Sequence, residues 1–190
     1  MVSRVNLPNA LSALRIALAP VLLVLGWVGA SQAFVVCLAV ALISDILDGK
    51  LARWLGQTSE FGARLDSMGD LLLYVVVPIC AVWLRPAFVR AELGWFAVAV
   101  AAAMIPVIVG LSKFGRPTSY HTRGAKLSAY LLGGSIFVIF ADGPAWPFQI
   151  ATVVFVLAEL EELAITSVLS EWRPNVPSLR HALALRVDKR

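Results

Sequence analysis

The sequence predicts an all-α integral membrane protein, on the evidence of its composition and of its long apolar blocks. Of its 190 residues, 59% are hydrophobic and only 15% are charged, and the mean hydropathy is +0.83. A soluble domain of this size is normally less apolar and richer in charge. Several apolar blocks reach the roughly 20 residues that a helix needs to cross the hydrocarbon core of a bilayer. The length leaves no room for a separate soluble domain of ordinary size.

We predict six transmembrane helices, each bounded by turn residues. Glycine, proline, serine and aspartate mark the expected turns at residues 29–31, 56–59, 85–86, 115–117 and 142–144. The predicted spans are Leu7–Val28, Gln32–Leu55, Asp66–Leu84, Ala91–Ser112, Ala125–Ala141 and Pro147–Ser170. They form one six-helix membrane domain over residues 1–170. A basic cytoplasmic tail is expected over residues 171–190.

The distribution of Lys and Arg predicts the orientation of these spans. With six spans, both termini share one side with the loops after the second and fourth spans. That side carries fourteen of the sixteen Lys and Arg residues, and the other side carries only Arg85 and Arg90. By the positive-inside rule, both termini are cytoplasmic. We expect a multi-pass protein of the bacterial inner membrane. The net charge of +4 favours anionic lipid or substrate, and no aromatic–basic pattern indicates a nucleic-acid partner.

The junction between the second and third predicted spans carries four aspartates. It reads Asp45-x2-Asp48-Gly49-x2-Ala52-Arg53-x8-Gly62-x3-Asp66-x3-Asp70. On a helix, the first two aspartates share a face with two small residues, and the last two share a face of the next helix. Carboxylates are costly in a bilayer, so such a cluster needs a partner that offsets its charge. Hard divalent cations prefer oxygen ligands, so we predict a site for one or two such ions.

A metal site of this kind suits phosphoryl transfer. Mg²⁺ held by a few carboxylates keeps coordination positions for phosphate oxygens. Arg53 follows the small face and can bind the same phosphates with its planar fork, while one carboxylate remains to accept a proton. The alternative is that the aspartates cap helices or pair with Lys50, Arg53 and Arg64. That alternative explains single aspartates better than it explains the whole spacing.

The segment resembles, at all eight defined positions over 26 residues, the signature of the CDP-alcohol phosphotransferases, also called CDP-alcohol phosphatidyltransferases. These are integral membrane enzymes of phospholipid synthesis. The run Pro8-Asn9-Ala10-Leu11-Ser12-Ala13-Leu14-Arg15 is similar to the family's short motif at the entry to the first helix. The resemblance implies six spans with cytoplasmic termini, a CDP-linked lipid donor, usually CDP-diacylglycerol, release of CMP, and a homodimer.

The resemblance also implies roles for individual residues. Asp45, Asp48 and Asp66 would hold one Mg²⁺ or Mn²⁺ ion, and Asp45, Asp66 and Asp70 would hold a second. Asp70 would also be the catalytic base that deprotonates the acceptor hydroxyl. The residues implied to bind the CDP-lipid are Asn9, Ser12, Gly49, Ala52, Arg53 and Ser59.

The acceptor is less well defined by the sequence. Lys113, Arg116 and Arg123 surround the loop after the fourth span and suit an anionic acceptor. Glycerol 3-phosphate, giving phosphatidylglycerophosphate, is the preferred prediction. Serine, inositol phosphate and phosphatidylglycerol are the other candidates. The alternative interpretation is that this basic cluster sets topology and contacts lipid headgroups.

A function from another class, divalent-cation transport, is the remaining alternative. Transport would need acidic residues spread through the depth of the bilayer, whereas the four aspartates lie at one boundary. Only Glu159 and Glu162, which share a face of the sixth span, lie deeper. An ionisable group at that depth is a functional candidate, although a buried pair with Arg15, or protonated acids facing a polar cavity, explains the two glutamates more simply.

Overall fold

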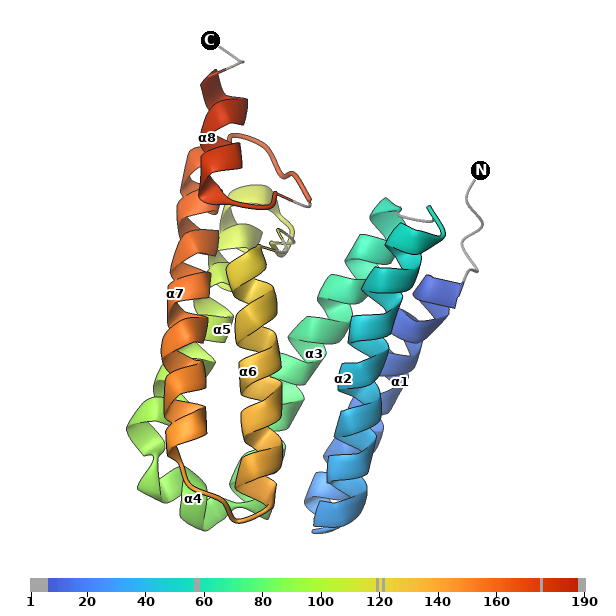
Figure 1. Ribbon diagram of the computed structural model, residues 1–190, viewed down its shortest axis with the longest axis vertical. Helices are drawn as coiled ribbons and strands as arrows, with labels where there is room; N and C mark the ends of the chain where they lie inside the picture. The colour runs from blue at the N-terminus through green and yellow to red at the C-terminus, as the bar shows by residue number, and fades with distance from the viewer. Residues whose placement is uncertain (1–6, 57–58, 119, 121, 175, 188–190) are drawn as a thin grey trace. The chain divides into compact units, whose positions relative to one another are not determined.

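The computed structural model describes residues 7–56, 59–118, 120, 122–174 and 176–187, and among these it is all-helical, as predicted. The chain divides into two compact units, Met1–Arg90 and Ala91–Arg190. Figure 1 labels the helices. The first unit contains α1 (Leu7–Trp27), α2 (Ser31–Trp54), α3 (Glu60–Leu84) and the short α4 (Pro86–Ala91). The second contains α5 (Leu93–Phe114), α6 (Arg123–Phe140), α7 (Trp146–Val168) and α8 (Leu179–Val187).

Helix α3 begins six residues before the predicted span. Ser59 has an extended backbone, with φ −145° and ψ 155°, and its side chain accepts a hydrogen bond from the Gly62 amide at 3.0 Å. Such an N-cap satisfies one of the free amides at a helix start and fixes where the helix begins. Asp66 therefore projects from within α3 and not from its first turn.

Three described segments are long and apolar enough to cross a membrane. They are Leu7–Trp27, Arg64–Leu84 and Leu93–Phe114, with mean hydropathies of 1.9, 1.9 and 2.2. The other three long helices, α2, α6 and α7, each carry ionisable side chains and do not meet the same test. Among the described residues, the structure thus supports three candidate spans of the predicted six. Together with the apolar composition, this identifies an integral membrane protein.

In the first unit, α1 packs along both α2 and α3. The buried residues of α1 recur in alternating steps of four and three, which keeps them on one side of the helix. They include Pro8, Ser12, Arg15, Ala19, Leu22 and Gly26. Within the described residues, α2 and α3 have at most marginal contact with each other. Helix α1 is therefore the element that holds the unit together.

Each of these three helices is apolar at one end of its buried stripe and polar at the other. On α2, Phe34 and Leu38 are fully buried, and the same stripe continues to Asp45 and Asp48. On α3, Cys80 and the other apolar core residues follow the aspartates in the chain. The apolar halves form a core, and the polar halves come together at the opposite end.

The apolar end is closely packed at Gly26. A Cβ atom at this position would lie 2.6 Å from the Cys80 sulfur, which itself lies 3.4 Å from the Leu22 carbonyl oxygen. Beside this contact, the rings of Trp27 and Trp83 meet edge to face, with centroids 5.4 Å apart. A small residue at a helix crossing permits such an approach.

The second unit has α7 as its central helix, in contact with α5, α6 and α8. Its core near the end of α7 consists of Tyr120, Ile165, Leu169, Val176 and Ala182. The chain after α7 therefore folds back on α7 and includes a helix of its own. That residues 171–190 form a cytoplasmic tail stays a prediction.

We expect Gly26→Ala to destabilise the α1–α3 contact, because the added methyl group would overlap the Cys80 sulfur. Overpacking of this kind costs about 1–3 kcal/mol. Thermal unfolding in detergent, followed by tryptophan fluorescence, measures the loss. Cys80→Ala in the same chain should recover part of it.

Gly134→Ala on α6 is the matched control, since a Cβ atom there meets nothing within 4 Å. Equal unfolding midpoints for Gly26→Ala and Gly134→Ala would contradict the close approach of α1 and α3.

Candidate functional site

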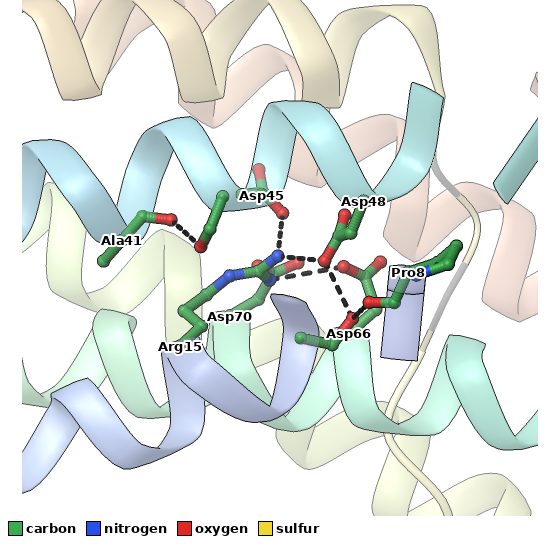
Figure 2. Close-up of polar contacts among 9 residues, drawn as sticks. Pro8, Arg15, Ala41, Asp45, Asp48, Asp66 and Asp70 are labelled. Carbon is green, nitrogen blue, oxygen red and sulfur yellow. Dashed lines mark hydrogen bonds and ion pairs between the residues drawn. The ribbon is translucent and has the colours of Figure 1, made fainter. Parts of the chain in front are cut away.

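One arginine lies at the centre of the four aspartates (Figure 2). The Nη2 atom of Arg15 lies 2.8 Å from Asp45 Oδ1 and 2.6 Å from Asp48 Oδ2. Its Nη1 atom lies 3.2 Å from Asp66 Oδ1 and 3.0 Å from Asp70 Oδ1. Each terminal nitrogen thus binds the two carboxylates of one helix, α2 or α3, as the planar guanidinium fork allows. The aspartates of two helices converge, and a cation from a third helix joins them.

The cluster runs from a buried centre to an accessible edge. The side chain of Arg15 is fully buried and that of Asp48 is 4% exposed, whereas that of Asp70 is 37% exposed. A buried charge persists only when it is paired, as Arg15 and Asp48 are. The more open carboxylates are those that a ligand would meet first.

The charge of the cluster favours a further cation. One guanidinium offsets only one of four carboxylates, so the cluster as a whole is strongly anionic. One oxygen from each of Asp45, Asp48 and Asp66 lies within 4.8 Å of the other two. Mg²⁺ holds oxygen ligands at about 2.0–2.1 Å, so opposite ligands stand about 4 Å apart. Small side-chain rotations would bring these oxygens to that geometry, and the donor set fits a hard divalent cation.

The buried residues of α1 also orient Asp48. The Ser12 hydroxyl donates to Asp48 Oδ2 at 2.8 Å, with the Pro8 carbonyl oxygen as a second acceptor at 3.3 Å. Asp48 therefore has two partners on α1, the Ser12 hydroxyl and the Arg15 guanidinium. Two side chains of α1 thus hold this carboxylate in place.

Two glycines of α3 give room to side chains of α1. A Cβ atom at Gly62 would lie 2.7 Å from Asn9 Oδ1 and 3.2 Å from Ser59 Oγ. A Cβ atom at Gly69 would lie 3.1 Å from Arg15 Cδ and 3.2 Å from its Nη1. A Cβ atom at position 62 would displace the Asn9 side chain, and one at position 69 would press against the Arg15 stem. Steric fit beside Asn9 thus explains why the signature has a glycine at residue 62.

The residues predicted to bind the CDP-lipid belong to the same three helices or their ends. Two of them are the buried α1 residues Asn9 and Ser12. Gly49 and Ala52 are half-buried on α2, and the serine at position 59 caps α3. The side chain of Arg53 lies outside the described part of the chain. Contact of these residues with a nucleotide stays a prediction.

Two of the three predicted acceptor residues make contacts that stabilise the second unit. Lys113 Nζ donates to the Thr166 and Ser167 carbonyl oxygens, at 2.7 and 3.1 Å. A lysine there binds carbonyls at the end of α7 and complements the negative end of its dipole. Arg116 lies over the Trp172 ring, 5.4 Å from its centroid, which is a cation–π contact.

The third predicted acceptor residue, Arg123, is the exposed first residue of α6. Thr122 caps this helix: its side chain accepts a hydrogen bond from the Ala125 amide at 3.1 Å. Arg123 is exposed, as are Lys113 and Arg116.

Nearby, Tyr120 and Thr166 share a hydrogen bond of 2.9 Å. Burial raises the pKa of the Tyr120 hydroxyl, which therefore stays neutral.

Arg15 was not predicted as a site residue. It entered the sequence analysis as the last residue of the short family motif, as one of the cytoplasmic-side cations and as an alternative partner of the two glutamates of the sixth span. In the structure, its two terminal nitrogens contact the four aspartates. The spacing of polar residues in the first predicted span could have indicated this role. Ser12 and Arg15 fall three residues apart on one face of an apolar helix, where an arginine needs a buried anion. Gly69, which is not a defined position of the signature, carried no comparable signal.

Comparisons with known proteins agree with a site of clustered aspartates that fits a divalent cation. The chain is 37% identical over 84 residues to a CDP-diacylglycerol–glycerol-3-phosphate 3-phosphatidyltransferase of Pseudomonas fluorescens, covering 40% of this chain and 41% of that protein. It is 42% identical over 78 residues to a cardiolipin synthase (CMP-forming) of Rattus norvegicus, covering 39% and 25%. It is 29% identical over 102 residues to a CDP-diacylglycerol–serine O-phosphatidyltransferase of Mycobacterium leprae, covering 54% and 33%.

These matches span less than half of the length of each relative. No solved structure matches the chain. The family profile described as CDP-alcohol phosphatidyltransferase, however, matches residues 5–165, which include all four aspartates and Arg15. The chain belongs to the CDP-alcohol phosphatidyltransferase family.

Proposed function

We propose that this protein transfers a phosphatidyl group from CDP-diacylglycerol to a small alcohol and releases CMP. The observation that carries the proposal is the convergence of four aspartates from α2 and α3 around one buried arginine. Membership of the family supports the class of donor. The aspartates gather at a single site and are not spread along a helix, which favours phosphoryl transfer over cation transport.

Asp70 is the proposed general base. With 37% of its side chain exposed, it is the most accessible carboxylate of the cluster, and a base must reach the proton that it accepts. The acceptor hydroxyl would lose its proton to Asp70 while its oxygen forms a bond to the lipid-side phosphorus. The bond from that phosphorus to the CMP oxygen breaks, and CMP leaves with the bonding electrons.

Asp45, Asp48 and Asp66 are the proposed ligands of one ion, and Asp45, Asp66 and Asp70 are the proposed ligands of a second. Bound Mg²⁺ or Mn²⁺ would supply positive charge and orientation to the diphosphate. Ser12 and Arg15 keep Asp48 in place for this role. The residues that we propose line the CDP-lipid pocket are Asn9, Ser12, Gly49, Ala52, Arg53 and Ser59.

We further propose six membrane spans, cytoplasmic termini and a homodimer in the bacterial inner membrane. The basis is the Lys and Arg distribution of the sequence and the three helices that are long and apolar enough to cross a membrane. The catalytic site would then face the cytoplasm, where CDP-linked lipid headgroups are accessible.

Glycerol 3-phosphate is the proposed acceptor. Its phosphate suits the cations around the loop between α5 and α6, and one relative bears that acceptor in its name. Other relatives are named for cardiolipin synthesis and for transfer to serine. Phosphatidylglycerol and serine are therefore the acceptors to compare first, followed by inositol phosphate.

The test of the function is CMP release by the purified protein, given CDP-diacylglycerol, Mg²⁺ and each acceptor in turn. We expect release with one acceptor and none in EDTA. Asp70→Asn should lower turnover by at least about 10²-fold, the scale of general base catalysis, while thermal stabilisation by CDP-diacylglycerol persists. Asp45→Asn should lose both turnover and stabilisation by metal.

Asp142→Asn is the matched control. This aspartate lies in the second unit at φ 54°, a conformation that asparagine accepts readily. No CMP with any acceptor, or full activity of Asp70→Asn, would refute the proposed function or the proposed base respectively.

Substitutions at the predicted acceptor-binding residues should have different effects, because these residues make different contacts. Arg123→Gln should raise the KM for an anionic acceptor about tenfold, the usual loss for one charge-assisted hydrogen bond, with no change in the unfolding midpoint. Lys113→Met should lower the midpoint, because it removes two hydrogen bonds to the end of α7. A KM unchanged in Arg123→Gln would exclude that residue from acceptor binding.

A further inference from the structure

We propose that Arg15 is the resident counter-cation of the aspartate site, and that a divalent metal competes with its guanidinium for the same carboxylates. This inference rests on the metal site of the proposed function. It adds a role for a residue of α1: Arg15 holds the site together when no metal is bound, and it sets how tightly metal binds. Arg15 is thus a positioning residue that acts through the metal ligands.

The first support is the way in which Arg15 is bound. Its two terminal nitrogens take one oxygen from each of the four aspartates, at 2.6–3.2 Å. The side chain is fully buried, and among the described residues its Nε atom has no hydrogen-bond partner. Within the described part of the chain, the polar contacts of the guanidinium are therefore with the carboxylates that would ligate metal.

The second support is the packing of the unit. Helix α1 packs along α2 and along α3, while α2 and α3 have at most marginal contact among the described residues. Nη2 binds the carboxylates of α2 and Nη1 binds those of α3. Without a cation between them, carboxylates of the two helices would repel each other. Arg15 supplies that cation from within the chain.

The third support is that the two cations would use the same carboxylate groups. The three aspartates whose oxygens lie within 4.8 Å of one another all contact Arg15. A guanidinium and a divalent ion that bind the same carboxylate groups repel each other strongly in a buried site. Metal entry must therefore weaken some of the bonds to Arg15. Gly69 lets the arginine stem pack directly against α3, since a Cβ atom there would lie 3.1 Å from Arg15 Cδ.

The experiment compares Arg15→Gln, Arg15→Lys and the wild type, each purified with Mg²⁺ and then treated with EDTA. Mn²⁺ affinity is measured by the electron paramagnetic resonance signal of free Mn²⁺. Arg15→Gln should bind Mn²⁺ at least about tenfold more tightly, because a repelling charge is gone. The unfolding midpoint of Arg15→Gln in EDTA should fall below that of the wild type. Mn²⁺ should then raise the midpoint of Arg15→Gln by about twice the amount by which it raises the wild-type midpoint. Arg15→Lys lacks the planar fork but keeps the charge that repels metal, so its Mn²⁺ affinity should stay within about threefold of the wild-type affinity.

Arg90→Gln, an exposed residue of α4, is the matched control and should change neither quantity. An arginine with a purely structural role would give weaker Mn²⁺ binding when removed, since damaged sites lose affinity. The inference would be overturned if Arg15→Gln bound Mn²⁺ as tightly as the wild type or more weakly. It would also be overturned if Arg15→Lys gained as much Mn²⁺ affinity as Arg15→Gln. A wild type that binds no Mn²⁺ would overturn both the inference and the proposed metal site, whereas normal Mn²⁺ binding without CMP release would refute only the proposed function.

Discussion

The first unit depends on one arrangement, a buried guanidinium shared by four carboxylates. Taking Arg15 and Asp48 out of water is costly, and only close pairing offsets that cost. The pairing requires α1, α2 and α3 to approach with their polar ends in register. The arrangement therefore fixes how the three helices meet, and it gathers the residues of the proposed phosphotransferase site in the same step.

The signature spacing and the packing of the helices are two aspects of one pattern. Asp45, Asp48 and Ala52 continue, in steps of three and four, the stripe that buries Phe34 and Leu38 on α2. Residues at such steps lie on one helix face. The aspartates of the signature thus occupy positions that would otherwise hold core side chains, and the small residues Gly49 and Ala52 share their helix face.

Sequence reasoning predicted the all-helical class, the positions of the main turns and the grouping of the four aspartates, because helical periodicity and clustered charge are local signals. It placed the start of α3 at Asp66, since the cap formed by Ser59 with the Gly62 amide is a weaker signal than apolar content. It missed the role of Arg15, whose partners lie 30 or more positions away in the chain. Pairing across three helices is a property of their packing and has no local pattern.

The close contact between Gly26 and Cys80 has a mechanical consequence for the first unit. The contact joins the Gly26 backbone of α1 to the Cys80 side chain of α3, so this end of the helix pair is held by steric fit. The other end is held by charge, through the ion pairs of Arg15 with Asp66 and Asp70. The α1–α3 pair therefore has one end that depends on residue size and another that depends on ionisation.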